Sequence, residues 1–238
     1  MIVYGKNVIK EVIKNKRLIH ELYVNYKIKD KSFLDFLNQN NIEYKFVDKH
    51  QLNEKANSFE HQGVVAKVAN YEYQNLFSFL DSDSFKSNQF KRFLILDEIH
   101  DPHNFGAILR TIETLQFDGV IISQKNQVLL SGAVAKASSG ALEYVNIFLV
   151  DNLFKTIIYL QSKDIVVIGT DSKTDLNLNK VNTNCSLAIV LGNEGKGIRP
   201  LLKQKCNFLM KIPMKGRINS LNVSIAAALI MYALQNKN

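Results

Sequence analysis

The stretch RFLILDEIHDPHNFGAILRTIETLQFDGVIIS, residues 92–123, decides the fold class of the second part of this chain. Residues 92–99 and 119–123 are almost continuously apolar, which is typical of strands buried on both faces of a sheet. Between them, residues 106–115 repeat apolar side chains at helical spacing. A strand, a helix and a second strand in this order predict a parallel pair joined by a crossover helix.

The same alternation continues toward the C-terminus. Further strands are predicted at residues 143–150, 164–170, 185–192 and 207–214, with helices at residues 152–161 and 197–205. We therefore expect an α/β domain whose parallel sheet is covered by helices on both faces. The strongly apolar residues 221–236 predict a final helix that is buried against the sheet or a partner subunit.

Residues 1–70 predict a separate, small α/β domain. Val8, Ile9, Val12 and Ile13 recur at helical spacing after Gly5. The remaining predicted elements are strands at 20–26, 42–47 and 63–71, a helix at 32–40 with Ser32 as its N-cap, and a helical turn at 51–57. The polar, aperiodic sequence DSDSFKSNQ, residues 81–89, marks residues 71–90 as a linker, so the second domain is expected to span residues 91–238.

The composition indicates a globular protein in the cytoplasm. Hydrophobic residues make up 46% and charged residues 22%, which excludes a mainly disordered chain. No run approaches the ~20 apolar residues of a membrane-spanning helix, and the first residues lack the order of a signal peptide. Cys185 and Cys206 are expected to be reduced, and His100 and His103 have no partners that would complete a metal site.

The charge balance favours a polyanionic partner. A net charge of +8 and a pI near 9.3 predict a surface that attracts nucleic acid, or less favourably an anionic membrane. The basic residues are dispersed along the chain, which favours binding by a folded domain over binding by a disordered arm.

Ligands of such parallel sheets bind beyond the carboxyl ends of the strands, so the loops there are the candidate sites. The first loop, HDPHNFGAILR, contains Asn104 as a possible helix cap and Arg110 one and a half turns into the helix. Arg110 is either a solvated arginine or a group that holds a phosphate or a reacting hydroxyl.

The second loop, GNEGKGIRP, has three glycines between a strand and a helix. It matches neither the P-loop nor the dinucleotide-binding pattern, so a phosphate cradle and a plain tight turn stay equally open. Glu194 stands out because a turn needs no carboxylate, and it is a candidate acceptor for an amine, a hydroxyl or an arginine.

The third loop, IPMKGRINSLNVSIAAAL, groups Ser220, Asn222 and Ser224 at the start of a helix, with Lys215 and Arg217 before them. One helix cap explains only one of these polar side chains, which indicates a polar pocket wall at a helix N-terminus. Hydrolase elbows of the GxSxG type, HExxH zinc motifs and paired glycosidase carboxylates are absent. The residues alone therefore predict a basic α/β protein with a pocket at three strand ends, and they do not name a reaction.

In this order and at this spacing, residues 96–113, 189–198 and 212–229 closely resemble the three motifs of the SpoU methyltransferases in the SPOUT superfamily. AKASSGALEYV, residues 135–145, is similar to the segment between the first two motifs, although Asn146 stands where a proline is common. YGKNVI (4–9) and HQGVVAKV (61–68) resemble the L30e/L7Ae-like substrate domain of the 23S rRNA guanosine-2′-O-methyltransferases.

The resemblance implies a fold, a cofactor and an assembly. The C-terminal part of the sheet would form a deep trefoil knot, an exception to the usual absence of knots. S-adenosylmethionine would be the methyl donor, RNA the substrate, and the active form a homodimer with the final helix in or near its interface. The implied cofactor-binding residues, which act largely through their backbone, are Leu191, Gly192, Ile212, Met214, Ser220 and Leu221, and no metal is implied.

It also implies roles for four catalytic residues. Arg110 would contact the target phosphate, often from the partner subunit. It would activate the ribose 2′-oxygen electrostatically, because an arginine stays protonated in proteins and is a poor base. Asn104 would orient Arg110 or the substrate, Glu194 would hold the arginine or the ribose, and Asn222 would complete the pocket.

The expected activity is 2′-O-methylation of a ribose, with a guanosine in the peptidyl-transferase region of 23S rRNA as the implied target. A tRNA enzyme of the same family is the first alternative, and a non-catalytic RNA-binding protein is the second. A nucleotide-dependent oxidoreductase ranks last because the dinucleotide-binding fingerprint is missing.

Overall fold

The computed structural model describes residues 1–82, 90–217 and 220–235. The chain divides into two compact units. Unit 1 comprises Met1–Glu72 together with Leu130–Tyr144, and unit 2 comprises Tyr73–Leu129 and Val145–Asn238. Unit 1 therefore includes fifteen residues that the sequence interpretation assigned to the second domain.

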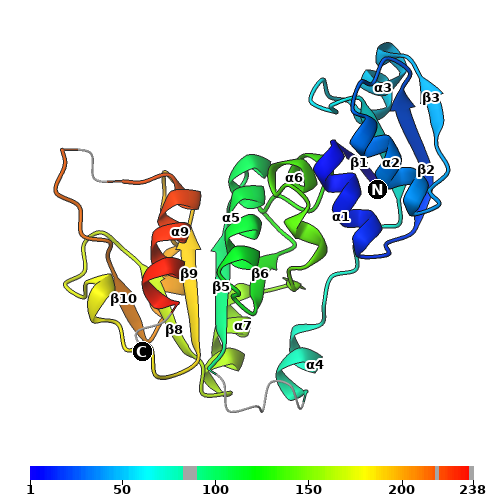
Figure 1. The fold of residues 1–238 in the computed structure, drawn as a ribbon. Coiled ribbons are helices and arrows are strands. Elements are labelled where there is room, and N and C mark those ends of the chain that lie inside the picture. Colours follow the sequence, from blue (N-terminus) through cyan, green and yellow to red (C-terminus); the bar gives the residue numbers. More distant parts are fainter. Residues whose placement is uncertain (83–89, 218–219, 236–238) are drawn as a thin grey trace. The chain divides into compact units, whose positions relative to one another are not determined.

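Unit 1 is built on a four-stranded sheet in the order β1-β4-β2-β3 (Figure 1). β4 is antiparallel to both of its neighbours, and β3 is parallel to β2. The strands are β1 (Ile2–Tyr4), β2 (Ile19–Asn25), β3 (Lys45–Val47) and β4 (Val64–Val68), and the helices of residues 1–72 are α1 (Lys6–Lys14), α2 (Lys31–Gln39) and α3 (Lys49–Ala56). The four apolar residues predicted for the first helix all lie on the buried face of α1.

The prediction of Ser32 as the N-cap of the second helix is wrong. α2 begins at Lys31, and Asp30 is its cap, since its side chain accepts a hydrogen bond from the Phe33 amide. The Ser32 hydroxyl instead donates to the same Asp30 carboxylate over 2.7 Å. A carboxylate at this position satisfies a free helical N–H and adds a favourable interaction with the helix dipole.

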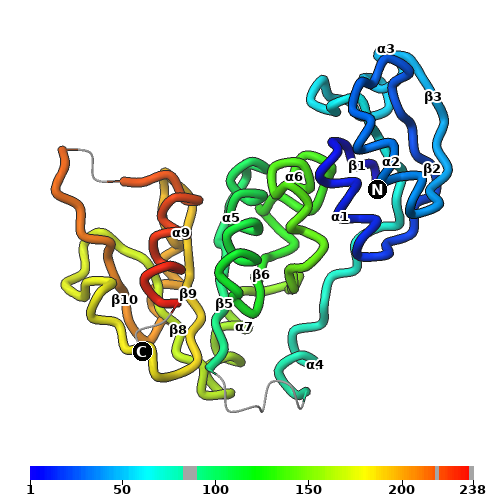
Figure 2. The backbone as a smooth tube through the Cα atoms, in the orientation of Figure 1, coloured from blue at the N-terminus to red at the C-terminus, as the bar shows by residue number. Residues whose placement is uncertain are grey.

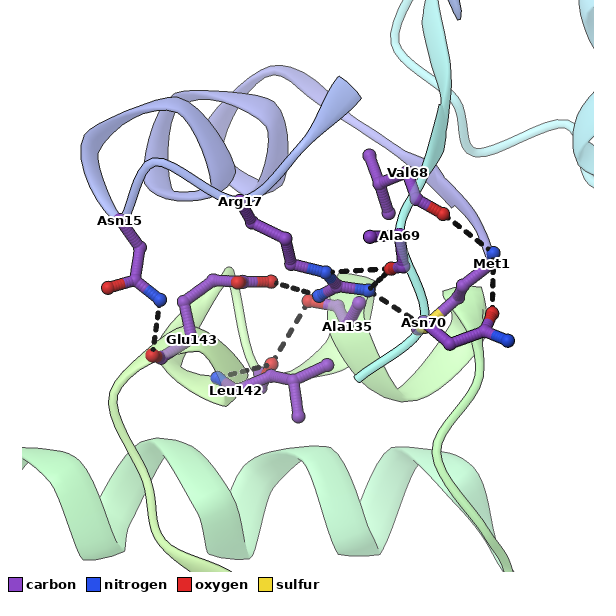
Figure 3. Close-up of polar contacts among 10 residues, drawn as sticks. Met1, Asn15, Arg17, Val68, Ala69, Asn70, Ala135, Leu142 and Glu143 are labelled. Atoms are coloured by element: carbon purple, nitrogen blue, oxygen red, sulfur yellow. Dashed lines mark hydrogen bonds and ion pairs between the residues drawn. The ribbon is translucent and has the colours of Figure 1, made fainter. Parts of the chain in front are cut away.

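Residues 130–144 are held in unit 1 by a buried ion pair (Figure 3). They form α6 (Gly132–Ala137) and a short 3-10 helix, η1 (Ala141–Glu143). Arg17 Nη1 lies 2.7 Å from Glu143 Oε1, and both side chains are at least nine-tenths buried. The same guanidinium donates to the Ala69 carbonyl, and the Asn15 amide donates to the Glu143 carbonyl. Removing either charge of such a pair would leave the other buried and uncompensated.

Unit 2 contains a six-stranded, wholly parallel sheet in the order β10-β8-β9-β5-β6-β7. This confirms the predicted parallel α/β fold. The strands are β5 (Arg92–Asp97), β6 (Gly119–Ser123), β7 (Ile147–Val150), β8 (Val166–Thr170), β9 (Leu187–Gly192) and β10 (Phe208–Met210). The helices are α4 (Leu76–Asp81), α5 (Pro102–Thr114), α7 (Leu153–Gln161), α8 (Pro200–Lys203), α9 (Val223–Leu234) and the 3-10 helix η2 (Leu178–Lys180).

Helices cover both faces of this sheet, as the apolar strands predict. Phe93 and Ile95 of β5 join a buried cluster with side chains of α4, α7 and α8. Leu94 and Leu96 are equally buried and must point to the opposite face, because side chains alternate along a strand. α5 and α9 pack against each other there, in front of the sheet in Figure 1.

Several predicted elements are shorter in the structure. The strand expected at residues 143–150 begins only at Ile147, because residues 141–143 form η1 and the Asn146 side chain donates to the Asp118 carbonyl. The strand expected at 207–214 is limited to β10, and the helix expected at 197–205 to α8. The expected linker contains α4, and residues 83–89 lie outside the described part of the chain.

The path of the last strands departs from sequence order (Figure 2). β9 lies between β8 and β5, the chain then crosses to β10 beside β8, and α9 returns to pack against α5. The trefoil knot itself stays a prediction.

Within residues 1–82, 90–217 and 220–235, no helix is long and apolar enough to span a membrane.

Candidate active site

The candidate site lies at the carboxyl edge of the sheet of unit 2. Asp97, the last residue of β5, is in register with Gly192 of β9, and Thr170 of β8 is in register with Met210 of β10. Because these strands are parallel, the loops that follow them emerge at one edge. All three motif loops of the sequence therefore start from the same side of the sheet.

The three loops meet in a cluster formed by Asn104, Glu194 and Asn222. Asn104 Nδ2 donates to Glu194 Oε1 over 2.7 Å, and Asn222 Nδ2 donates to the same oxygen over 2.9 Å. The triangle is closed by a 2.9 Å hydrogen bond from Asn222 Nδ2 to Asn104 Oδ1. No described residue donates to the other carboxylate oxygen, Glu194 Oε2. The cluster therefore fixes one side of the glutamate and leaves its second oxygen able to accept a hydrogen bond.

Asn104 is not the helix cap that its position predicted. α5 begins at Pro102, and the cap is Asp101, whose side chain accepts from the His103 amide. Asn104 therefore lies in the first turn of α5, and its side chain is free to bind Glu194. The cap of α9 is Asn222, whose Oδ1 accepts from the amides of Ser224 and Ile225 and from the Ser224 hydroxyl. Asn222 uses its oxygen for the helix and its amide for the cluster.

A buried carboxylate anchors the loop that carries Glu194. Asp97 is fully buried at the end of β5, and it accepts hydrogen bonds from the backbone amide and the Nε of Arg199, over 2.9 and 2.7 Å. Arg199 Nη2 also lies 2.7 Å from Asp97 Oδ1. At the other end of the loop, Asn193 Nδ2 donates to the Glu98 carbonyl over 3.0 Å. Both ends of the loop are thus fastened to the end of β5.

The glycine-rich loop does not present a phosphate cradle. The amides of Gly195 and Lys196 donate to Asn193 Oδ1, and the Gly197 amide donates to the Asn193 carbonyl. These N–H groups are already used, so they are not available to an anion. Gly192 is required for packing, since a Cβ there would lie 2.1 Å from the Gly197 carbonyl carbon.

An apolar cavity of about 140 Å³ opens beside this cluster. Three of the predicted cofactor-binding residues, Ile212, Met214 and Leu221, line it, and Leu221 precedes Asn222 directly. The other three do not line it: Leu191 is buried within β9, Gly192 packs on its own loop, and Ser220 is exposed. Thr170, Asp171, Ser172, Met210, Lys211 and Ala226 complete the wall.

Sequence reasoning missed the part of this wall that follows β8. Thr170, Asp171 and Ser172 stand at the carboxyl end of the predicted strand 164–170, so the rule used for the other loops would have found them. Asp171 is paired with Lys203 over 2.8 Å, and this hydrogen bond lowers the pKa of the Asp171 carboxyl. Its negative charge is therefore maintained at neutral pH.

Arg110 is not part of the cluster within one chain. It is exposed on α5, and no described residue forms an ion pair or a side-chain hydrogen bond with its guanidinium. Six residues along a helix place Arg110 roughly 120° around the axis from Asn104. His100 and His103 are likewise exposed, and no group of three potential metal ligands occurs among the described residues.

Two family models match the chain. Residues 91–232 match the SpoU rRNA methylase family, and residues 2–74 match the RNA 2′-O ribose methyltransferase substrate-binding family. A relative from Bacillus subtilis, described as a putative TrmH family tRNA/rRNA methyltransferase, is 38% identical over 99% of this chain and 95% of its own length. A relative of the same description from Staphylococcus haemolyticus is 39% identical over 100% and 96%.

Solved structures share the fold. The SpoU methyltransferase AviRb from Streptomyces viridochromogenes, crystallised with AdoMet, superposes with a TM-score of 0.81 at 20% identity, covering 99% of this chain and 89% of that one. An AdoMet-bound rRNA methyltransferase from Sinorhizobium meliloti gives a TM-score of 0.78 at 19% identity over 98% and 86%. Fold and matches together define an RNA methyltransferase. The chain belongs to the SpoU rRNA methylase family.

Proposed function

We propose that this enzyme methylates the 2′-hydroxyl of a ribose in 23S rRNA, at a guanosine, with S-adenosylmethionine as methyl donor. The observation that carries the proposal is the cluster of Asn104, Glu194 and Asn222 beside the apolar cavity. The match of residues 2–74 to a ribose methyltransferase substrate-binding family supports the ribose as acceptor.

The cavity suits this cofactor chemically. Met210, Ile212 and Leu221 offer apolar surface for an adenine ring, and the polar groups that follow β8 can accept hydrogen bonds from ribose hydroxyls or an ammonium group. The Asp171 carboxylate is the charged group in that set, and it is held in place by Lys203. When bound, S-adenosylmethionine would supply an electrophilic methyl group, whose bond to sulfur breaks as its bond to the ribose 2′-oxygen forms. The hydroxyl proton would pass to the Glu194 carboxylate.

The protein positions and activates the hydroxyl. Glu194 keeps Oε1 engaged with the two asparagines, so Oε2 is the oxygen that would accept the hydrogen of the ribose 2′-hydroxyl. A hydroxyl is a weak nucleophile at neutral pH, and a positioned acceptor raises its reactivity. Arg110 would hold the adjacent phosphate by a two-pronged hydrogen bond and stabilise negative charge on the 2′-oxygen.

We further propose that the enzyme is a homodimer in which Arg110 serves the site of the partner. Ile225, Leu229 and Tyr232 form one exposed apolar stripe on α9, with exposed fractions of 52%, 46% and 74%. α9 packs against α5, the helix that carries Arg110. A dimer through this stripe would bury it and would bring Arg110 toward a second copy.

The assembly is tested by sedimentation of Leu229→Glu, with Ile158→Glu on α7 as the matched control, because Ile158 is 45% exposed away from the stripe. The first variant is expected to be monomeric and the control dimeric. Heterodimers of Arg110→Ala with Asn222→Ala then locate the arginine. If Arg110 acts on the partner, one of the two sites in each heterodimer keeps both residues, so purified heterodimers have about half of the wild-type activity. Inactive heterodimers mean that Arg110 acts within its own chain.

The substrate is tested with labelled S-adenosylmethionine and separate rRNA and tRNA pools, followed by mapping of the methylated nucleotide. Label in a guanosine of 23S rRNA is the expected result. Label in tRNA would replace the rRNA proposal with the tRNA alternative. A protein that binds RNA but does not bind S-adenosylmethionine in calorimetry would instead be a non-catalytic RNA-binding protein.

A further inference from the structure

A basic pocket lies in unit 1, and most of its lysines stand outside the motif stretches 4–9 and 61–68. Its volume is about 430 Å³. The carboxyl end of β2, the starts of α1 and α3 and the loop before β4 meet around it. Its lining includes Lys6, Lys27, Lys29 and Lys49, together with Tyr26 and Gln62.

The lysines of this pocket are mostly without a counter-charge. Lys6 is paired with Asp30 over 2.8 Å. In residues 1–72, all of which are described, no carboxylate forms an ion pair with Lys27, Lys29 or Lys49. The helix dipoles of α1 and α3 add partial positive charge at the same place, because both helices start there. The pocket therefore concentrates positive potential that an anion would relieve.

Hydrogen bonds hold the backbone around the pocket. Asn25 Oδ1 accepts from the Lys27 amide, and the Asn25 carbonyl accepts from the Ile28 amide. On the opposite wall, Gln62 Oε1 accepts from the Lys6 amide over 3.2 Å. Gln62 and Gly63 both have positive φ, 55° and 82°, so this wall is a tight left-handed turn.

A buried histidine supports that turn without adding charge. His61 Nδ1 accepts from the Gly63 amide over 3.0 Å, which makes Nε2 the protonated nitrogen, and Nε2 lies 2.9 Å from Asn53 Oδ1. Burial, followed by repulsion from Lys49 and Lys136, lowers the pKa of His61. The histidine is therefore neutral, and the anion-attracting charge comes from the lysines.

Residues 130–144 bring one more cation to this region. The Nζ of Lys136 lies 2.8 Å from the position that a Cβ on Gly5 would take, beside Gln62 Oε1. Glycine is favoured at this position because Gly5 has a φ of 96°. No described carboxylate forms an ion pair with Lys136, so the segment adds to the same positive field.

An exposed aromatic ring borders the lysines. Tyr26 is 58% exposed, and its backbone amide is fixed by the Val47 carbonyl. Lys27 Nζ lies 5.5 Å from the centroid of the ring. An exposed ring next to lysines is the combination that binds a nucleic acid base and its phosphates together.

We infer that this pocket is a binding site for phosphodiester groups and one unstacked base of the substrate RNA. The inference rests on the proposed RNA methylation and assigns the part of unit 1 that holds the substrate. Lys27, Lys29 and Lys49 contact phosphates, and Tyr26 stacks on the base. Binding in this pocket increases the affinity for the substrate RNA, whereas methyl transfer takes place in unit 2.

The test is RNA affinity and its salt dependence in full-length Lys27→Ala/Lys29→Ala, with Lys45→Ala/Lys67→Ala as the control. The control removes the same charge from exposed positions of the same sheet that do not line the pocket. The pocket variant is expected to bind a 23S rRNA fragment about tenfold more weakly, and its salt slope is expected to fall by about two. Tyr26→Ala is expected to weaken binding about tenfold, whereas Tyr26→Phe keeps the wild-type affinity.

Kinetics separate this inference from the proposed function. The pocket variant should raise the KM for RNA and leave both kcat at saturating RNA and S-adenosylmethionine affinity unchanged. Equal losses of RNA affinity in the pocket and control variants would contradict the pocket assignment. They would indicate that RNA binds to positive charge spread over the surface of unit 1. If the wild-type protein methylates RNA and the pocket variant has the same KM for RNA, the pocket assignment is wrong and the proposed function stands. Wild-type protein that binds phosphatidylglycerol vesicles and no RNA would overturn both proposals.

Discussion

Asn104 and Glu194 are 90 residues apart in the chain, yet the Asn104 amide donates to Glu194 Oε1 over 2.7 Å. Asn222 donates to the same oxygen, so each of the three motif loops contributes one side chain to a single hydrogen-bonded cluster. A carboxylate that accepts two amide hydrogens on one oxygen is fixed in orientation. Its second oxygen is then presented in a defined direction.

Replacing Glu194 by glutamine should abolish most of the activity. The glutamine side chain removes the negative charge and gives the two asparagines a less basic acceptor. We expect kcat to fall roughly 10²-fold or more if the carboxylate activates the ribose hydroxyl. The measurement is methyl transfer at saturating RNA, with S-adenosylmethionine affinity followed by calorimetry.

The control for this variant is Glu113→Gln on α5, an exposed glutamate outside the cluster. It should keep the wild-type kcat. A Glu194→Gln enzyme with a normal kcat would show that the carboxylate only ties the three loops together.

Replacing Arg110 by alanine should remove activity without removing cofactor binding. The guanidinium is exposed and has no ion-pair partner among the described residues, so its loss should not disturb the fold. Transfer is expected to fall at least about 10²-fold, as for other removed groups that stabilise developing charge. Arg110→Lys should keep only part of the wild-type activity, since lysine lacks the planar guanidinium that donates two parallel hydrogen bonds.

Lys155→Ala on α7 is the matched control for Arg110, because it removes an exposed cation elsewhere in unit 2. The two variants should have equal thermal stability. Undiminished methylation by Arg110→Ala would remove Arg110 from the proposed mechanism.

Replacing Asp97 by asparagine should destabilise unit 2. Asp97 is fully buried and accepts charged hydrogen bonds from Arg199, whose side chain is 44% exposed and can be partly solvated after the change. The expected loss is about 2 kcal/mol in the free energy of unfolding, the range of a hydrogen bond to a charged group. Urea unfolding measures it, and the exposed Asp151→Asn should cost much less. An unchanged urea midpoint would contradict the anchoring role of Asp97.

The stability of unit 1 should fall at acid pH through Asp30. Hydrogen bonds from Lys6, Ser32 and the Phe33 amide lower the pKa of Asp30 in the folded chain. Its contribution is therefore present above the unfolded pKa, near 3.8, and is lost as the pH falls toward the folded value. Urea midpoints measured from pH 6 to pH 3 should decline less steeply for Asp30→Asn. Asparagine is also a good N-cap, so the helix start is preserved. Identical pH profiles for the two proteins would exclude this linkage.

The sequence predicted the layers of the fold well, because a strand buried on both faces is apolar along its whole length. Residues 92–97, 119–123 and 187–192 are almost continuously apolar, and all three form central parallel strands. Element ends were less predictable. Ser32 and Asn104 both have side chains suited to capping, but Asp30 and Asp101 cap the two helices, since several nearby residues can satisfy the same free amides.

The sequence by itself determined the candidate residues: its resemblance to the SpoU motifs pointed to Asn104, Glu194 and Asn222, and the basic composition indicated a polyanionic partner. Only the tertiary structure decided how these residues are arranged. The parallel sheet brings three loops to one edge, where Glu194 binds the two asparagines and Arg110 stays apart from them within one chain. Likewise, Lys136 belongs to unit 1 because Glu143, in the same segment, pairs with Arg17, a contact across 126 residues that no local pattern encodes. Such contacts depend on which elements pack together in the fold, and the spacing of residues along the chain does not predict this packing.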